Sequence, residues 1–381
     1  MGILKYFFGL LFLLFSFQTY AQQAPVKVAV FAPVYIDSAF IDNEYKLGNN
    51  NLPKYILPGL EFYNGVMMAI DSLRAEGQSV ELFFYDTKSS KEPLTSIIQK
   101  PEMKEVTLII ASFNNRSELK TLADYAAAQH IPLISATYPN DGGITHNPYF
   151  ILVNSTLRTH CEELYKYIQR YYATNKMIYI RRKGTAGDVI QSVFEEQGRT
   201  TPAIPLKYKT VELTDTFSIA QLTGNLDSIQ RNVVFCGSLD DNFSMRVVRT
   251  ISAAKKFPCT IIGMPTWDGL QLIDDNTSGN IEIIFSTPYH FVRSDKAAQS
   301  IIQKYKMISF GRPSDMVFKG FEATYHFVHL VQLYPTSFLQ HLSDKHYSLF
   351  NEFDFQPVKN RSNATITDRV ENRKLYFIKK P

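Results

Sequence analysis

The chain has 381 residues, of which 45% are hydrophobic and 13% aromatic, a composition that can fill hydrophobic cores and excludes a disordered protein. Its 40 Lys and Arg residues against 36 Asp and Glu give a formal net charge of +4, and the basic residues are dispersed, which argues against a nucleic-acid partner. At roughly 100 to 200 residues per domain, this length predicts two lobes.

The N-terminal residues are typical of a secretory signal. Lys5 precedes an almost entirely apolar run from Tyr6 to Phe17, and Thr19-Tyr20-Ala21 follows. The run is too short to span a bilayer, and no later stretch reaches the roughly 18 apolar residues that a span needs. We therefore expect cleavage after Ala21 and an exported, soluble chain. Because no cysteine stands at the cut, we expect no lipid anchor and no membrane insertion.

Short apolar runs then alternate with amphipathic runs, which is typical of parallel sheets with crossover helices. In the first half we expect helices at about 62–73 and 117–129, and residues 37–55 form an Asn-rich excursion before the first of them. The strands expected here are Val26–Pro33, Glu81–Tyr85, Val106–Ala111, Ile131–Ile134 and Tyr149–Val153.

The alternation restarts near Asn154, which suggests that the chain enters a second lobe there. Helices are expected at 157–172, after the turn at 183–188, and near 219–229, 242–256 and 267–273. The strands expected are Met177–Ile180, Tyr208–Glu212, Asn232–Cys236, Cys259–Gly263 and Ile281–Phe285. Two such series predict an α/β fold of two doubly wound, Rossmann-like lobes.

The three cysteines, Cys161, Cys236 and Cys259, are an odd number for an oxidising compartment. Two of them lie inside apolar strand-like runs. This placement favours small buried side chains over a bridge between Cys236 and Cys259 that would leave Cys161 free.

Motifs of known enzyme classes are missing from the sequence: there is no Gly-x-Ser-x-Gly elbow, no His-Glu-x-x-His helix and no paired cysteine cluster. His326 and His329 lie three apart without an evident third ligand, so a metal site is disfavoured. Nothing in the sequence brings Asp86 and Asp188 together as an acid pair. We expect a protein that is not an enzyme and has no catalytic residue, metal or cofactor.

Six segments, in order along the chain, carry a resemblance to a known family. They are Lys27-Val-Ala-Val-Phe-Ala-Pro33, Leu60-Glu-Phe-Tyr-Asn-Gly65 with Met67-Met-Ala-Ile-Asp-Ser-Leu73, Phe84-Tyr-Asp-Thr87, Leu133-Ile-Ser-Ala-Thr137, Asp315-Met-Val-Phe-Lys-Gly-Phe-Glu-Ala-Thr-Tyr325 and Glu371-Asn-Arg-Lys-Leu-Tyr-Phe-Ile378. With them the chain resembles the type I periplasmic binding proteins, the branched-chain amino-acid and amide receptor group, in the variant common in exported proteins of Bacteroidetes-like bacteria.

The resemblance implies two lobes joined by a hinge that the chain crosses three times. Lobe 1 is expected to comprise 22–153 and 288–340, and lobe 2 to comprise 154–287 and 341–381. It also implies a periplasmic receptor that closes around a small polar solute and presents it to a membrane transporter of the ABC type or to a sensor. The alternative is an envelope interaction or scaffold protein that has lost its small ligand.

In lobe 1 the candidate ligand-binding residues are two tripeptides that follow strands, Ser112-Phe113-Asn114 and Ser135-Ala136-Thr137. Hydroxyl groups and free backbone N–H groups at strand ends and helix starts can hold an anion, and the family uses matching positions for an amino-acid carboxylate. The alternative is that these residues are ordinary helix caps. Tyr35, after the first strand, is a further candidate.

In lobe 2 the turns depart from the family pattern. The candidates are Ser238 and the single tryptophan, Trp267, which can offer a stacking face or be a core residue. The turn Met264-Pro265-Thr266-Trp267 contains no carboxylate to pair with a ligand ammonium, and Arg181-Arg182 makes another turn basic, so plain α-amino acids are not the expected ligand. Tyr289, near the second crossing, can reach the ligand or belong to the hinge.

Overall fold

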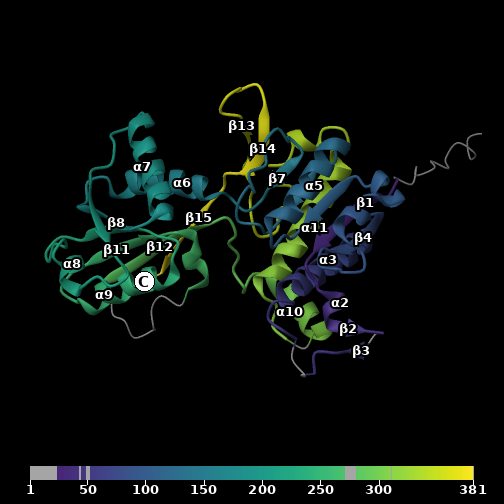
Figure 1. The fold of residues 1–381 in the computed structure, drawn as a ribbon, viewed down its shortest axis with the longest axis horizontal. Coiled ribbons are helices and arrows are strands. Elements are labelled where there is room, and N and C mark those ends of the chain that lie inside the picture. Colours follow the sequence, from purple (N-terminus) through teal and green to yellow (C-terminus); the bar gives the residue numbers. More distant parts are fainter. Residues whose placement is uncertain (1–23, 43, 49–51, 271–279, 310, 381) are drawn as a thin grey trace, which may run out of the picture.

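We analysed a computed structural model of the chain, which describes residues 24–42, 44–48, 52–270, 280–309 and 311–380. The expected signal, residues 1–21, lies outside the described residues, as does the end of the helix expected at 267–273. Two sheets, each covered by helices on both faces, form two lobes side by side (Figure 1). No helix in the described ranges is both long enough and apolar enough to cross a membrane.

The first lobe is built on a seven-stranded sheet with the order β13-β14-β7-β6-β5-β1-β4. All neighbouring pairs are parallel except β13 with β14, which is antiparallel. The strands are β1 (Val26–Ala32), β4 (Val80–Asp86), β5 (Leu108–Ala111), β6 (Leu133–Ser135), β7 (Phe150–Leu152), β13 (Phe355–Lys359) and β14 (Thr367–Asn372).

One face of this sheet is covered by α3 (Leu57–Ala75) and α11 (Asp315–Leu333), with α10 (Lys296–Ser309) packed outside them. Gly65 and Gly320 allow α3 and α11 to approach closely. A Cβ atom on Gly65 would lie 2.0 Å from the carbonyl oxygen of Val317, and one on Gly320 would lie 2.3 Å from that of Phe62. The other face carries α5 (Arg116–Gln129) and α4 (Leu94–Ile97).

The expected excursion at 37–55 contains short elements: α2 (Ile36–Ala39), β2 (Phe40–Ile41) and β3 (Glu44–Tyr45), the last two paired as a small hairpin. Single-turn 3-10 helices occur at η1 (Pro101–Glu105) and η3 (Phe338–Gln340).

The second lobe has a six-stranded sheet with the order β15-β12-β11-β10-β8-β9, parallel except for β15 against β12. Its strands are β8 (Met177–Arg182), β9 (Tyr208–Leu213), β10 (Asn232–Gly237), β11 (Cys259–Gly263), β12 (Ile281–Thr287) and β15 (Tyr376–Lys380). The helices α6 (Leu157–Tyr172) and α7 (Thr185–Thr200) cover one face, while α8 (Ile219–Thr223), α9 (Asp241–Ala253) and η2 (Pro265–Gly269) cover the other.

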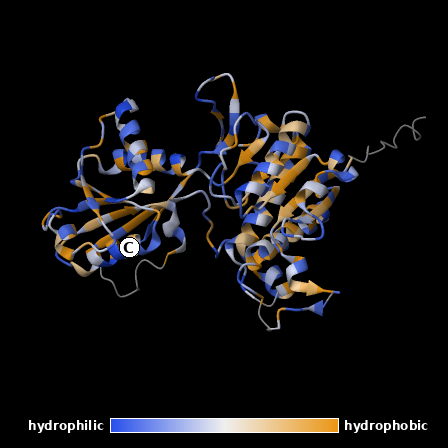
Figure 2. Cartoon of the chain, viewed as in Figure 1, coloured by the Kyte–Doolittle hydropathy of each residue, from blue (hydrophilic) through white to orange (hydrophobic). Residues whose placement is uncertain are grey.

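Hydrophobic residues concentrate in the strands of both sheets, as the parallel-sheet pattern predicts (Figure 2). Cys161, Cys236 and Cys259 are free and buried, which agrees with small buried side chains rather than with a disulfide.

The tail of the chain differs from the expectation that all of 341–381 belongs to lobe 2. β13 and β14 extend the first sheet, with Val370 opposite Ile151 of β7, and only β15 joins the second. The physical reason is burial: Phe353 and Val370 belong to the hydrophobic core of the first lobe. The chain therefore changes sheets between Asn372 and Tyr376.

The first crossing follows β7, where the sequence pattern restarts, and the second follows β12. The α8 helix is shorter than the expected 219–229. It begins with a capping box formed by Ser218 and Gln221, and Gly224 is its C-terminal cap.

Candidate functional site

Two hydroxyl groups meet where neighbouring strands of the first sheet end. Ser112 follows β5 and Thr137 lies just beyond β6, and their oxygens are 2.9 Å apart. Because β5 and β6 are parallel neighbours, both polar residues emerge at the same edge of the sheet. The structure thus brings together the two segments that the sequence singled out in lobe 1.

Ser135, the last residue of β6, is fully buried, and its Oγ atom has no hydrogen-bond partner among the described residues. A buried hydroxyl without a partner costs roughly 1–3 kcal/mol. This group is therefore a candidate for satisfaction by a bound ligand or water.

Phe113 and Ala136, also members of the tripeptides, have apolar side chains packed in the core and offer no polar group to a solute. Phe113 is 5% exposed and packs in the core under α5, edge-on to Tyr138. Ala136 is fully buried, and its carbonyl oxygen accepts a hydrogen bond from the Tyr289 hydroxyl.

Asn114 and Tyr35 form a polar rim beside these strand ends. The Asn114 side-chain amide donates to the Tyr35 hydroxyl at 2.9 Å. Asn114 is not the cap of α5: Asn115 has that role, accepting from the N–H of Glu118 at 2.9 Å. Lys88 completes the rim, pairing with Glu118 at 2.5 Å and lying 5.9 Å from the centre of the Tyr35 ring.

Tyr289 lies on the second crossing, directly after β12, and its hydroxyl bonds to the end of β6. Burial raises the pKa of this hydroxyl well above its ordinary value, so it remains a donor at neutral pH. The residue therefore connects the hinge with the strand ends of lobe 1.

Trp267 is not a stacking face for a ligand in this structure. Its side chain is fully buried in the core of the second lobe and lies over β11, where a Cβ on Gly263 would be 2.1 Å from the ring. The single tryptophan, in a turn after a strand, was a candidate stacking face, but the absence of a side chain at Gly263 lets the ring turn inward. The core alternative raised from the sequence is the one observed.

Ser238 is also engaged locally. It is 3% exposed, and its hydroxyl accepts the N–H of Asp240, which in turn caps α9 through the N–H of Phe243 at 2.8 Å. The basic turn is likewise paired: Arg182 contacts Asp215 at 2.7 Å, and Arg181 contacts Glu212 at 3.2 Å.

Sequence reasoning missed Asp268, the residue after Trp267. Its carboxylate accepts from the Thr287 hydroxyl at 3.3 Å, at the end of β12. Asp268 also lines a small cavity of about 30 Å³ together with Tyr289 on the hinge and Lys319 on α11. The signal was present in the sequence, one position beyond the turn that was compared with the family.

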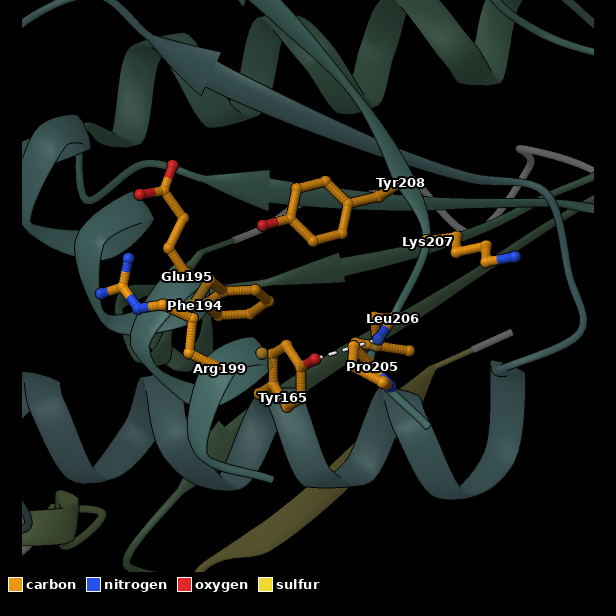
Figure 3. A pocket seen from close by; sticks show the side chains of 9 residues that line it. Tyr165, Phe194, Glu195, Arg199, Pro205, Leu206, Lys207 and Tyr208 are labelled. Atoms are coloured by element: carbon orange, nitrogen blue, oxygen red, sulfur yellow. Dashed lines mark hydrogen bonds between the residues drawn. The ribbon is translucent and has the colours of Figure 1, made fainter. Parts of the chain in front are cut away.

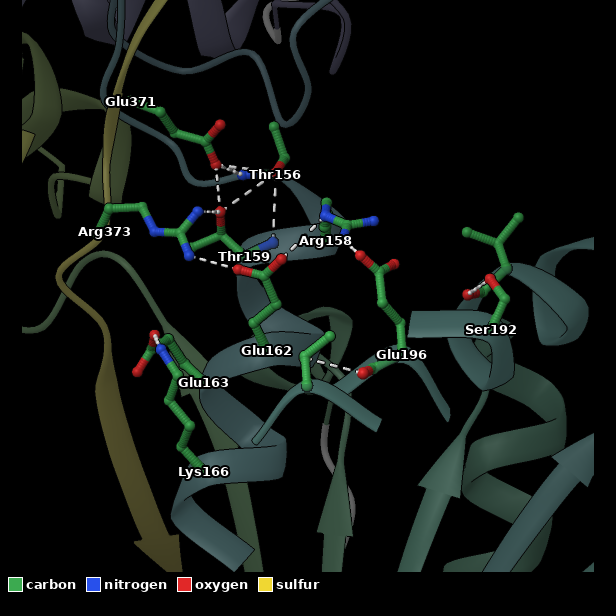
Figure 4. Close-up of polar contacts among 12 residues, drawn as sticks. Thr156, Arg158, Thr159, Glu162, Glu163, Lys166, Ser192, Glu196, Glu371 and Arg373 are labelled. Carbon is green, nitrogen blue, oxygen red and sulfur yellow. Dashed lines mark hydrogen bonds and ion pairs between the residues drawn. The ribbon is translucent and has the colours of Figure 1, made fainter. Parts of the chain in front are cut away.

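At the third crossing a polar network connects the end of β14 with the start of α6 (Figure 4). Glu371 of β14 is 1% exposed and accepts from the backbone N–H of Thr156 at 2.9 Å and from its hydroxyl at 2.8 Å. Arg373, on the crossing, donates to Glu162 and Thr159 of α6. Burial acts to raise the pKa of Glu371, but hydrogen bonds from Thr159 and Thr156 and the charge of Arg369 lower it overall. The carboxylate is therefore ionised at neutral pH.

The larger cavities lie away from the strand ends. One of about 510 Å³ in lobe 2 lies between α6, α7 and the segment that leads into β9, lined by Tyr165, Phe194 and Tyr208 (Figure 3). The Tyr165 hydroxyl accepts the N–H of Leu206 there, at 3.0 Å.

No group of three or more metal-ligating side chains is found within the described residues. His329 contacts Glu76 at 3.0 Å, while His326 is fully buried in the lobe 1 core. Asp86 accepts backbone N–H groups of its own lobe and Asp188 pairs with Arg181, so the two acids serve separate structures.

Neither a family model nor a curated protein matches the chain. Solved structures match over most of its length. A putative branched-chain amino-acid ABC transporter protein from Rhodospirillum rubrum aligns with a TM-score of 0.62 and 12% identity, covering 87% of this chain and 93% of that one. A branched-chain amino-acid ABC transporter periplasmic ligand-binding protein from Burkholderia xenovorans aligns with a TM-score of 0.57 and 14% identity, covering 92% of this chain and 89% of that one.

A substrate-binding protein from Desulfitobacterium hafniense, solved in complex with Leu, gives a TM-score of 0.54 at 11% identity, covering 94% of this chain and 98% of that one. At these identities the likeness shows the fold. The chain has the two-lobed fold of the type I periplasmic binding proteins, as the six sequence segments indicated.

Proposed function

We propose that the protein is an exported, periplasmic solute-binding protein that closes its two lobes around a small polar ligand and delivers it to a membrane transporter. The observation that carries this proposal is the group of hydroxyls at the strand ends of lobe 1, where Ser112 and Thr137 are paired and Ser135 has no hydrogen-bond partner in the described part of the chain. Ligands of open α/β sheets bind beyond the carboxyl ends of the strands.

The chemistry of this group suits an anion such as a carboxylate. A carboxylate has about four acceptor positions, and hydroxyl groups can turn to donate to it. In the neighbouring rim Lys88 adds positive charge, although Glu118 balances it. The named relatives are transport proteins, one of them solved with leucine, which supports a small solute rather than a macromolecule as the ligand.

A melting-temperature screen of amino acids, hydroxy acids, amides, short peptides and cell-wall fragments tests the proposal. A ligand that binds only the folded state stabilises it by about 2.7 kcal/mol at a hundredfold excess over Kd. We expect at least one compound to raise the melting temperature, and the double variant Ser135→Ala with Thr137→Val to abolish that increase. Ser252→Ala with Thr223→Val is the matched control, because these hydroxyls bond to helix carbonyls in lobe 2.

A second candidate, a scaffold protein without a small ligand, is favoured by the lobe 2 turns. Trp267 is buried, Ser238 holds its own turn, and Arg181 and Arg182 are paired with acids. A screen with no stabilising compound, together with no small molecule retained on purification, would favour this second function.

A further inference from the structure

Lys319 and Asp268 are two opposite charges that line the same small cavity beside the hinge, one from each lobe. Lys319 lies on α11 of lobe 1, with its Nζ atom 4.4 Å from the centre of the Tyr289 ring. Asp268 lies in η2, after β11 in lobe 2. Neither forms an ion pair within 4.0 Å among the described residues, although each feels the charge of the other.

The other charged groups of the cavity are already satisfied. Asp315 pairs with Arg293 at 3.0 Å. Glu322 accepts the backbone N–H groups of Phe350 and Asn351 and the side-chain amide of Asn351. Lys319 is therefore the cationic side chain that lines this cavity with Asp268, and the charge of Lys380 also acts on Asp268 from outside the lining.

Both groups have lost part of their water. Burial lowers the pKa of Lys319, and loss of water around the carboxyl group raises the pKa of Asp268, although the residue as a whole is exposed. Such shifts accompany charges that lack a close partner. Each charge is therefore stabilised by the other when the lobes approach.

Tyr289 joins this pair to the hydroxyl group of lobe 1. Its ring lies beneath the Lys319 ammonium, and its hydroxyl bonds to Ala136, between Ser135 and Thr137. In a solute whose carboxylate binds those hydroxyls, the substituent on the neighbouring carbon would lie close to Lys319 and Asp268.

We propose that Lys319 takes the place of a ligand ammonium opposite Asp268, so that the solute is a carboxylate without an ammonium group, such as an α-hydroxy acid. This inference rests on the proposed solute-binding function. A zwitterionic amino acid would bring its ammonium to a pair whose net charge is already zero, and burying an ammonium without a charge partner is costly.

Calorimetric titration of the mature chain with three matched pairs tests this specificity: lactate against alanine, phenyllactate against phenylalanine, and malate against aspartate. We expect at least one hydroxy acid to bind, and to bind tenfold or more tightly than its amino acid. Lys319→Met should reverse the preference by freeing Asp268, whereas Lys345→Met, which removes an exposed lysine paired with Glu352, should not.

Should Lys319→Met fail to fold, Asp268→Asn provides the complementary variant. It leaves Lys319 as an uncompensated cation, so hydroxy-acid binding should persist or tighten while amino acids remain excluded. Equal or tighter binding of an amino acid by the unmodified protein would overturn the inference. If none of the six probes binds while the broader screen yields a ligand, the specificity inference is wrong and the solute-binding function stands; a blank result in both contradicts the function itself.

Discussion

The carboxylate of Glu371, on a strand of the first sheet, accepts hydrogen bonds from both the backbone and the side chain of Thr156, the residue that caps the first helix of the second lobe. A negative charge at a helix N-terminus is stabilised by the orphan N–H groups and the helix dipole. The relationship fixes the start of α6 to the sheet of lobe 1 at the point where the chain crosses.

Replacing Glu371 by Gln should therefore destabilise the protein. The substitution removes a buried charge that faces Arg369 and two threonine donors, and breaking such a pair costs about 3–5 kcal/mol. Urea denaturation measures the loss. Glu352→Gln, which alters an exposed acid paired with Lys345, should change the free energy of unfolding far less, because solvent screens exposed ion pairs. Equal effects of the two substitutions would show that the network does not hold the hinge.

The pH dependence of stability should carry a signature of Glu322. Burial raises the pKa of this carboxyl group to about 7 in the folded protein. A folded pKa above the unfolded value means that the native state binds the proton more tightly between these two values. Stability contributed by this group is therefore lost as the pH rises from about 4.5 to about 7.

Comparison with Glu322→Gln isolates that signature, because other titrating groups contribute equally to both proteins. Between pH 5 and pH 8 the unmodified protein should lose roughly 3 kcal/mol relative to the variant. Urea denaturation at the two pH values provides the measurement. A difference between the two proteins that does not change with pH would show that Glu322 keeps an ordinary pKa.

Ser135→Ala should leave the unliganded protein as stable as before or slightly more stable, because the substitution removes a buried hydroxyl that has no partner in the described structure. The same change should weaken the affinity for the solute by about ten- to hundredfold, if the hydroxyl donates to a charged ligand oxygen. A marked drop in the melting temperature without ligand would instead identify Ser135 as a structural residue.

The buried position of Trp267 depends on Gly263. A methyl group at Gly263 would overlap the indole ring, so Gly263→Ala should lower the free energy of unfolding by about 1–3 kcal/mol through overpacking. Gly269→Ala is the matched control, since a Cβ there meets no atom within 4 Å. The two variants should also differ in tryptophan fluorescence. A stable Gly263→Ala protein with native fluorescence would contradict the packing.

Most strands and helices were predictable because their signals are local. The helical spacing of Phe62, Val66, Ile70 and Leu73 marks α3, and Gly77, with a φ of 81°, ends it. The tail was not predictable in the same way. Whether a strand joins one sheet or another depends on which core receives Val370 and Phe353, and the pairing of Val370 with Ile151 joins residues more than two hundred positions apart.

The candidate site was predictable only in lobe 1. There the strand ends are adjacent in a parallel sheet, so that Ser112 and Thr137 meet as a consequence of the fold. In lobe 2 the direction of a side chain decides its role. Trp267 turns into the core while Asp268, the next residue, turns toward the hinge, and the amino-acid pattern does not distinguish these directions.

Native mass spectrometry of the protein released from the periplasm by osmotic shock tests the central claim most directly. The account predicts a retained molecule of a few hundred daltons or less, present on the unmodified protein and on the Ser252→Ala, Thr223→Val control, and absent from the Ser135→Ala, Thr137→Val variant. A protein that carries no small molecule and gains none from periplasmic extract, or one that retains its ligand after the Ser135 and Thr137 hydroxyls are removed, would contradict it.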